Sequence, residues 1–90
     1  MKGPTTMAPE FPLPARFFGG PVVAGVYIPR AGIYMPLWAV VAESARPGEF
    51  HVGLLHNDQE GFDGLYDIPG REQALDRMRE KADIWRKARR

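Results

Sequence analysis

Residues 33–42 are apolar on both sides of the segment, and this feature constrains the fold more than any other. In a β-strand, successive side chains point to opposite faces, so the segment presents two rows. A strand with one face in water alternates apolar and polar residues, whereas both rows here are apolar. The sheet that contains this segment is therefore expected to be covered on both faces. One row consists of Ile33, Met35, Leu37, Ala39 and Val41, and the other of Tyr34, Trp38, Val40 and Ala42, with Pro36 among them.

The rest of the chain supplies the other elements of a small sheet. β-Branched and aromatic residues mark the strands, and glycine, proline and polar residues mark the turns between them. The expected strands lie at 22–28, 33–42 and 50–56, with a short edge strand at 65–68, and the expected turns and loops lie at 29–32, 44–49 and 57–64.

A helix is expected from Pro69 and Gly70 to the end of the chain. Proline is tolerated in a first helical turn, and Asp67 is the candidate N-cap. Four apolar residues recur every three or four positions and form one stripe along the helix, which is the side expected to pack on the sheet. They are Leu75, Met78, Ala82 and Trp85.

The N-terminal segment is too rich in proline to be a helix, since each proline fixes φ and removes a backbone donor. We expect an extended arm over residues 1–18 and a single β-β-β-α domain over 19–90. The fold class is α+β: a three- to four-stranded antiparallel meander, with one C-terminal helix packed on it and the proline-rich arm outside it. A chain of 90 residues fits one such domain.

A single helix covers only one face of the sheet, so the second face needs another cover. Leaving a patch of a few hundred Å² in water would forgo several kcal/mol of stabilisation, at about 25 cal/mol per Å². Two covers are open at this point. The arm can fold back through its apolar residues Phe11, Leu13, Phe17 and Phe18, or another molecule can occupy the face.

Composition argues against several function classes. The chain has no cysteine, which excludes disulfides, thiolate metal sites and a cysteine nucleophile. The only serine, Ser44, falls in an expected turn, and no glycine series with a lysine forms a phosphate loop. His51 and His56 point to opposite faces of an expected strand and cannot share a metal. We expect no catalytic activity, cofactor, metal or small-molecule substrate, and, without a signal peptide or long apolar run, a cytoplasmic protein that does not contact membranes.

Charge is distributed unevenly along the chain. Residues 43–67 carry six acids and one base, whereas residues 68–90 carry eight bases and four acids. Separate acidic and basic patches suit the orientation of a charged partner. With the doubly apolar segment and the aromatic arm, they predict a protein-binding module: an adaptor, an accessory subunit or a small inhibitor of the kind that phages and mobile elements encode. Its partner would be another protein or a second copy, and the candidate contact residues are Tyr27, Tyr34, Trp38, Val40, Asp58, Glu60 and Asp63.

Nucleic acid is the alternative partner. The last helical turn is strongly basic and can contact phosphates. Cations at this position also favour the negative end of the helix dipole, which is a purely structural role. Acidic residues are interspersed along the same helix, so a coherent basic face is not evident. The candidate phosphate contacts are Arg86, Lys87, Arg89 and Arg90.

Overall fold

The computed structural model describes residues 9–56 and 59–89, without the side chains of 59–66. It shows an antiparallel sheet of five strands in sequence order, followed by one helix. This confirms the α+β meander with a C-terminal helix, and the sheet has five strands rather than three or four. The elements are β1 (Arg16–Phe17), β2 (Gly20–Ile28), β3 (Leu37–Glu43), β4 (Glu49–His56), β5 (Gln59–Pro69) and α1 (Arg71–Ala88).

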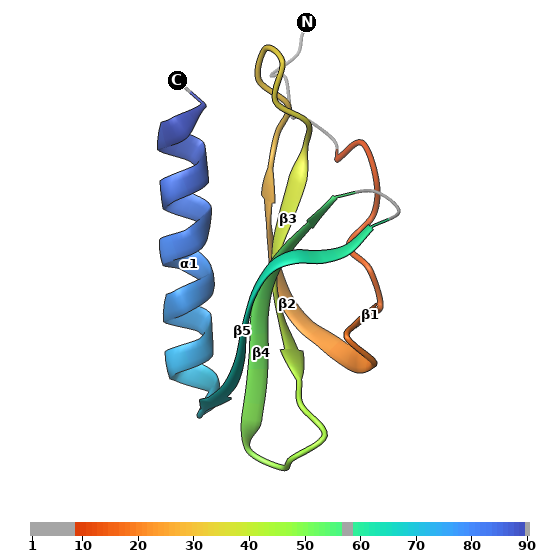
Figure 1. Ribbon diagram of the computed structural model, residues 1–90, viewed down its shortest axis with the longest axis vertical. Helices are drawn as coiled ribbons and strands as arrows, with labels where there is room; N and C mark the ends of the chain where they lie inside the picture. Colours follow the sequence, from red (N-terminus) through yellow and green to blue (C-terminus); the bar gives the residue numbers. More distant parts are fainter. Residues whose placement is uncertain (1–8, 57–58, 90) are drawn as a thin grey trace, which may run out of the picture.

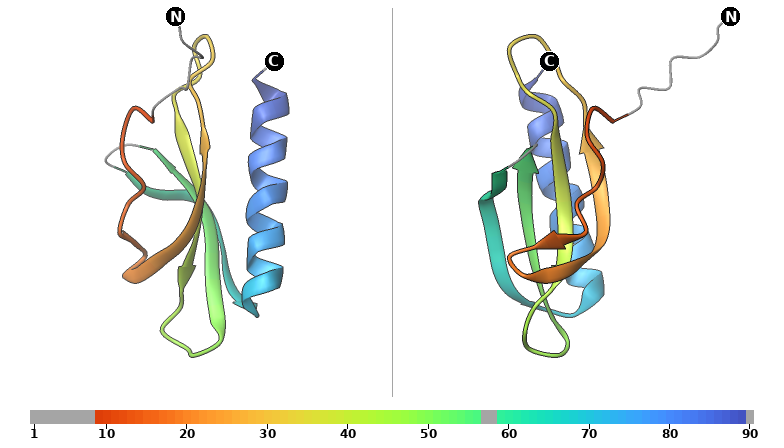
Figure 2. Two further views of the ribbon diagram at one scale, coloured as in Figure 1. Left: turned by 180° about the vertical axis from the view of Figure 1, so that it is seen from behind. Right: turned by 90° about the vertical axis from the view of Figure 1, so that its right-hand side faces the viewer.

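The molecule has three layers. Helix α1 runs along one face of the sheet, and residues 9–17 cross the opposite face (Figures 1 and 2). The β2–β3 connection and the C-terminal end of α1 lie at the same end of the molecule (Figure 1). Of the two covers left open for the second face, the structure therefore shows the arm.

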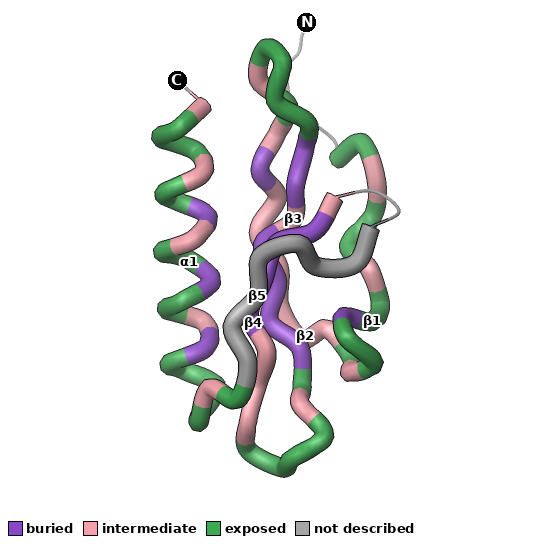
Figure 3. Tube along the Cα trace, in the orientation of Figure 1, coloured by how far each residue is buried: buried purple, intermediate pink, exposed green. Residues whose placement is uncertain are grey.

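The helix-side core follows from the register of the strands. Ala39 of β3 lies between Val26 of β2 and Leu54 of β4, and all three side chains face the helix. Met78 and Ala82 of α1 pack on this row and are buried. Figure 3 shows the buried positions of α1 gathered on the side that faces the sheet. The expected helical stripe is thus confirmed.

The start of α1 differs from the sequence expectation. The helix begins at Arg71, and its N-cap position is Gly70, which has no side chain to cap it. Asp67 belongs to β5 and has a φ of 61°, where the pairing of β4 and β5 is irregular. The prediction of Asp67 as N-cap was wrong, because β5 continues through Pro69 and keeps this residue in the sheet.

The arm-side core is smaller and contains Phe17, Val40, Ala42 and Leu55, all fully or almost fully buried. The strand registers place Val40 in one row with Gly25, Gly53 and Gly64, so that glycines flank it on both neighbouring strands. These missing side chains leave room for the arm. A Cβ added to Gly25 would collide with the Leu13 side chain, and would lie 3.1 Å from the Trp38 ring.

The connection between β2 and β3 is longer than the sequence indicates. β3 begins at Leu37 rather than residue 33, and residues 29–36 form a loop, which we call the hairpin tip. Pro29 and Pro36 stand at its two ends, and neither can donate a backbone hydrogen bond to continue the ladder. Within the tip, the backbone amides and carbonyls of Ala31 and Tyr34 pair at 2.9 and 3.1 Å.

The prediction of a polar loop over 57–64 was also wrong for residues 59–64, which the structure describes as part of a strand. β5 begins at Gln59 and pairs with β4 through Gly64 opposite Gly53 and Asp63 opposite Leu54. Ladder pairing uses backbone groups and does not require apolar side chains. Hydrophobic patterning therefore did not reveal this half of the strand.

An ion pair ties the arm to the hairpin tip. Arg30 donates from Nε and Nη2 to the two carboxylate oxygens of Glu10, at 2.9 and 2.7 Å. The hydrogen bond from Arg30, reinforced by its charge, lowers the pKa of Glu10 below the ordinary 4.5, although partial desolvation opposes this. Both side chains remain about half exposed, so the pair orients the arm rather than stabilising the core.

The ion pair predicts a specific pH dependence. Folding lowers the pKa of Glu10, so the stabilisation is complete above the ordinary pKa and is lost as pH falls through the lowered pKa. An NMR titration of the Glu10 carboxyl should give a midpoint below 4.5, and Arg30→Gln should move that midpoint back toward 4.5. A midpoint that Arg30→Gln does not change would contradict the pairing.

Candidate partner-binding surface

Three of the seven residues expected to contact a protein partner lie under or against the arm. Val40 is completely buried, and Trp38 donates its indole Nε1–H to the Phe11 carbonyl at 3.0 Å. The hydroxyl of Tyr27 accepts a hydrogen bond from the backbone amide of Glu10 at 2.9 Å. The arm thus occupies the sheet face for which the sequence left either the arm or a partner open.

The acidic candidates are not placed. Asp58 lies outside the described residues, and so do the side chains of Glu60 and Asp63, although their backbones belong to β5. Tyr34 remains as the expected contact residue that the structure places on an open surface, at the hairpin tip.

The hairpin tip carries the largest concentration of exposed apolar side chains among the described residues. Ile33 is 91% exposed, and its neighbours Tyr34 and Met35 are 44% and 49% exposed. An isoleucine left in water forgoes about 1.5–3 kcal/mol of burial free energy. Single exposed apolar residues are common, but three in succession at the end of a hairpin form a patch of the kind that marks interaction sites.

The hairpin tip and the last turns of α1 border a groove of about 250 Å³, which we call the end groove. Leu37, the first residue of β3, is buried, and Trp85 of α1 packs against the helix-side core. The groove combines aliphatic and aromatic side chains with one imidazole and one guanidinium. Its lining residues are Ile33, Tyr34, Met35, Leu37, His56, Trp85 and Arg89.

Arg89 joins α1 to the hairpin tip. Its Nη1 donates to the Pro29 carbonyl at 2.9 Å, and its guanidinium carbon lies 5.7 Å from the centre of the Tyr34 ring. Burial lowers the pKa of Arg89, while Tyr34 and Tyr27 raise it by smaller amounts. The residue keeps its charge at any physiological pH, so the groove holds a cation that is partly withdrawn from water.

The residues expected to contact phosphates are largely engaged within the chain. Besides Arg89, Arg86 donates to the Tyr27 carbonyl at 3.4 Å, and Lys87 lies 3.9 Å from the Asp83 carboxylate. Arg90 lies outside the described residues. The contacts of Arg86 and Arg89 join the end of the helix to β2 and the hairpin tip, whereas Lys87 and Asp83 form an ion pair within α1.

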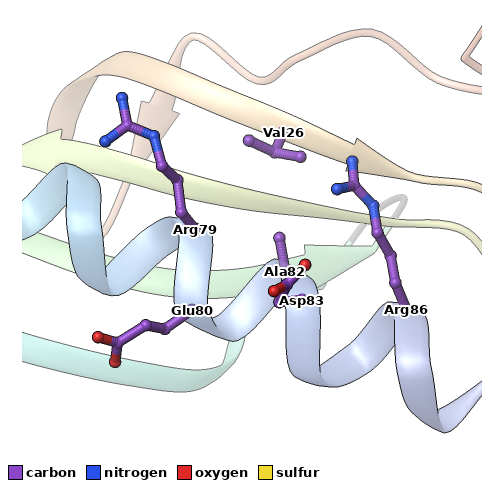
Figure 4. A pocket seen from close by; sticks show the side chains of 6 residues that line it. All are labelled: Val26, Arg79, Glu80, Ala82, Asp83 and Arg86. Carbon is purple, nitrogen blue, oxygen red and sulfur yellow. The ribbon is translucent and has the colours of Figure 1, made fainter.

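A second groove, of about 370 Å³, lies between α1 and β2 (Figure 4). Figure 4 shows Arg79 and Arg86 reaching from α1 toward β2, with Val26 between them, whereas Glu80 points away. Because each charged residue has a partner in the chain, this groove favours no class of ligand. The pairs are Arg79 with Asp76 at 3.2 Å, Glu80 with Arg77 at 3.4 Å, Asp83 with Lys87 at 3.9 Å, and Arg86 with the Tyr27 carbonyl at 3.4 Å.

Ile33 and Met35 are site residues that sequence reasoning placed elsewhere. They were assigned to one row of a strand expected to be covered on both faces, yet both are exposed at the hairpin tip. The two prolines at 29 and 36 were the available signal, because together they prevent the ladder from continuing into the segment between them. Reading Pro36 as the strand boundary would have moved both residues into the turn.

Membrane-spanning character, metal-binding clusters and similarity to known proteins give no indication of the function. Within the described residues, no helix combines the length and the apolar character needed to cross a bilayer. In the same part of the chain, no three His, Asp or Glu side chains come together to hold a metal ion. No protein-family model, curated protein or solved structure matches this chain. The functional inference therefore rests on the surface itself.

Proposed function

We propose that this protein is a non-enzymatic protein-binding module that contacts its partner through the hairpin tip and the end groove. The observation that supports this most is the exposure of Ile33, together with Tyr34 and Met35, beside a groove. Burial of this patch against a partner would recover free energy that the isolated chain forgoes. An adaptor, an accessory subunit or a small inhibitor all act in this way, by occupying a partner's surface.

The side chains at this end are of the types that dominate protein interfaces. Tyrosine, tryptophan and arginine are enriched among residues that contribute most to binding, and methionine is enriched in interfaces generally. Tyr34, Trp85, Arg89 and Met35 supply all four around one groove. By comparison, the basic residues of α1 alternate with acids, to which several of them are paired, and this favours a protein over a nucleic acid.

The test is capture of the partner from cells of the natural source. Tagged wild type is compared with an Ile33→Asp, Met35→Asp double variant, which adds charges to the exposed tip without entering the core. Ile84→Asp is the matched control, because Ile84 is also an exposed apolar residue but lies on α1 outside the groove. We expect the same protein to be recovered with wild type and with Ile84→Asp, and at least about tenfold less with the double variant.

Two results would contradict this function. One is equal recovery of the partner by wild type and the double variant, with all three proteins melting at similar temperatures. The other is recovery of nucleic acid that is released between low and moderate salt, because phosphate contacts are strongly salt-dependent. The second result would favour the alternative role of the basic helix end.

A further inference from the structure

We infer that the end groove recognises a large apolar side chain of the partner together with a carboxylate next to it. The recognised element is thus a short acidic–apolar segment of another protein, such as aspartate followed by phenylalanine. This inference depends on the proposed function and specifies its chemistry.

The groove has the size and the lining for one ring or one branched aliphatic side chain. A dry cavity of about 150 Å³ with an apolar lining is enough to take a benzene molecule. The end groove, at about 250 Å³, is larger and open to solvent. Ile33, Met35 and Leu37 supply aliphatic walls, and Tyr34 and Trp85 supply aromatic ones, against which a ring can pack edge to face.

The charge in the groove identifies what accompanies the apolar side chain. Arg89 uses Nη1 for the Pro29 carbonyl, while its Nε is buried and has no hydrogen-bond acceptor among the described residues. A guanidinium has five N–H donors, so Arg89 retains donor capacity after its internal contact. A carboxylate beside the groove would neutralise this partly desolvated cation and accept charge-assisted hydrogen bonds.

The other charges at this end of the helix also favour a negatively charged ligand. Arg86 and Lys87 lie in the last turn of α1, Arg89 is the C-cap residue that follows it, and Asp83 is the acid one turn earlier. This end of the helix therefore presents net positive charge to an approaching segment. A phosphodiester backbone would satisfy that charge but would leave Ile33, Tyr34 and Met35 in water, whereas an acidic–apolar peptide satisfies both.

Three capped peptides test the inference directly. They are acetyl-Gly-Ser-Asp-Phe-Ser-Gly-amide, the same peptide with Asn for Asp, and the same peptide with Ala for Phe. Binding is followed by NMR through the indole N–H signals of the two tryptophans, Trp38 and Trp85. We expect the Asp-Phe peptide to bind about tenfold more tightly than either of the others, and to shift Trp85 more than Trp38.

Protein variants separate the two parts of the recognition. Arg89→Gln should make the Asp and Asn peptides bind equally, and Arg89→Lys should retain part of the difference because it retains the charge. Ile33→Ser should weaken both Phe-containing peptides. Arg77→Gln is the control, since Arg77 is an exposed cation on α1 outside the groove, and it should leave the ratio of affinities unchanged.

Several outcomes would overturn the inference. Equal affinity of wild type for the Asp and Asn peptides would exclude recognition of the carboxylate. Absence of binding by the Asp-Phe peptide at millimolar concentration would exclude acidic–apolar segments as ligands of the groove. A dimer of wild type that Ile33→Asp dissociates would make a second copy the occupant. Each of these can occur while partner capture still depends on Ile33 and Met35, so failure of the inference is distinguishable from failure of the proposed function.

Discussion

Phe17→Ala is expected to lower the free energy of unfolding by about 3–5 kcal/mol, the usual loss for a large aromatic removed from a core. Phe17 is fully buried at the centre of the arm-side core, against Val40, Ala42 and Leu55. Removing its ring leaves a cavity that β1, only two residues long, is poorly placed to refill. Since domains of this size have only a few kcal/mol of net stability, much of the variant should be unfolded at 37 °C.

Phe18→Ala is the matched control for this prediction. Phe18 follows Phe17 directly and the centres of the two rings lie 4.6 Å apart, but Phe18 is 39% exposed. Its loss should cost about 1 kcal/mol, in the range of one aromatic pair. Urea unfolding monitored by tryptophan fluorescence measures both. Similar losses for the two variants would mean that the arm does not contribute to the core as the structure indicates.

Gly20→Ala is expected to destabilise the fold by about 2–3 kcal/mol, a large effect for one methyl group. A Cβ at Gly20, the first residue of β2, would overlap the backbone carbonyl oxygen of Glu43 at the end of β3. A backbone atom held in a strand cannot rotate away, so the start of β2 and the turn from β1 must move instead. In a domain of this size the melting temperature should fall by roughly 10–20 °C.

Gly25→Ala is the comparison variant, because the added methyl group meets a side chain there instead of the backbone. At Gly25 the nearest atom is the terminal Cδ1 of Leu13, on a half-exposed side chain that can change rotamer. The loss should therefore be about 1 kcal/mol or less, although the Trp38 ring is also close. Thermal unfolding of the two variants side by side checks this order. A larger loss at Gly25 would show that the arm is packed more rigidly than the sheet beneath it.

The position of the arm also changes where a partner can bind. From the sequence, one helix leaves the second face of the sheet bare, and either the arm or a partner that contacts Trp38 and Val40 was open as its cover. In the structure the arm covers this face, and the exposed apolar surface lies instead at the hairpin tip and the end groove. The protein-binding proposal is retained, but its surface has moved from a face of the molecule to one end.

The strand content was predictable because burial imposes a period of two on the side chains. Within β3, Leu37, Ala39 and Val41 do face the helix, and Val40 and Ala42 face the arm, as alternation requires. The first four residues of the expected strand were misplaced, because apolar character alone does not distinguish a buried strand from an exposed turn. The polar half of β5 was missed for the complementary reason, since its pairing with β4 uses backbone groups.

The candidate site was predictable only in part. Tyr34 and Arg89 were singled out from the sequence, but as members of two competing interfaces, one for protein and one for nucleic acid. The structure brings them together, with the guanidinium of Arg89 beside the Tyr34 ring and bonded to the hairpin tip. Residues 55 positions apart in the chain meet because the β2–β3 hairpin and α1 end at the same end of the molecule (Figure 1).

The order of apolar and polar residues was by itself sufficient to determine the architecture: an antiparallel meander, a terminal helix with one apolar stripe, and a sheet that needs cover on both faces. These properties follow from local periodicity, which each segment carries within itself. Which segment supplies the second cover, and which apolar residues remain in water, were decided only in the tertiary structure. Both depend on contacts between distant segments, such as Leu13 over Gly25 and Arg89 against Pro29, and no local pattern encodes those distances.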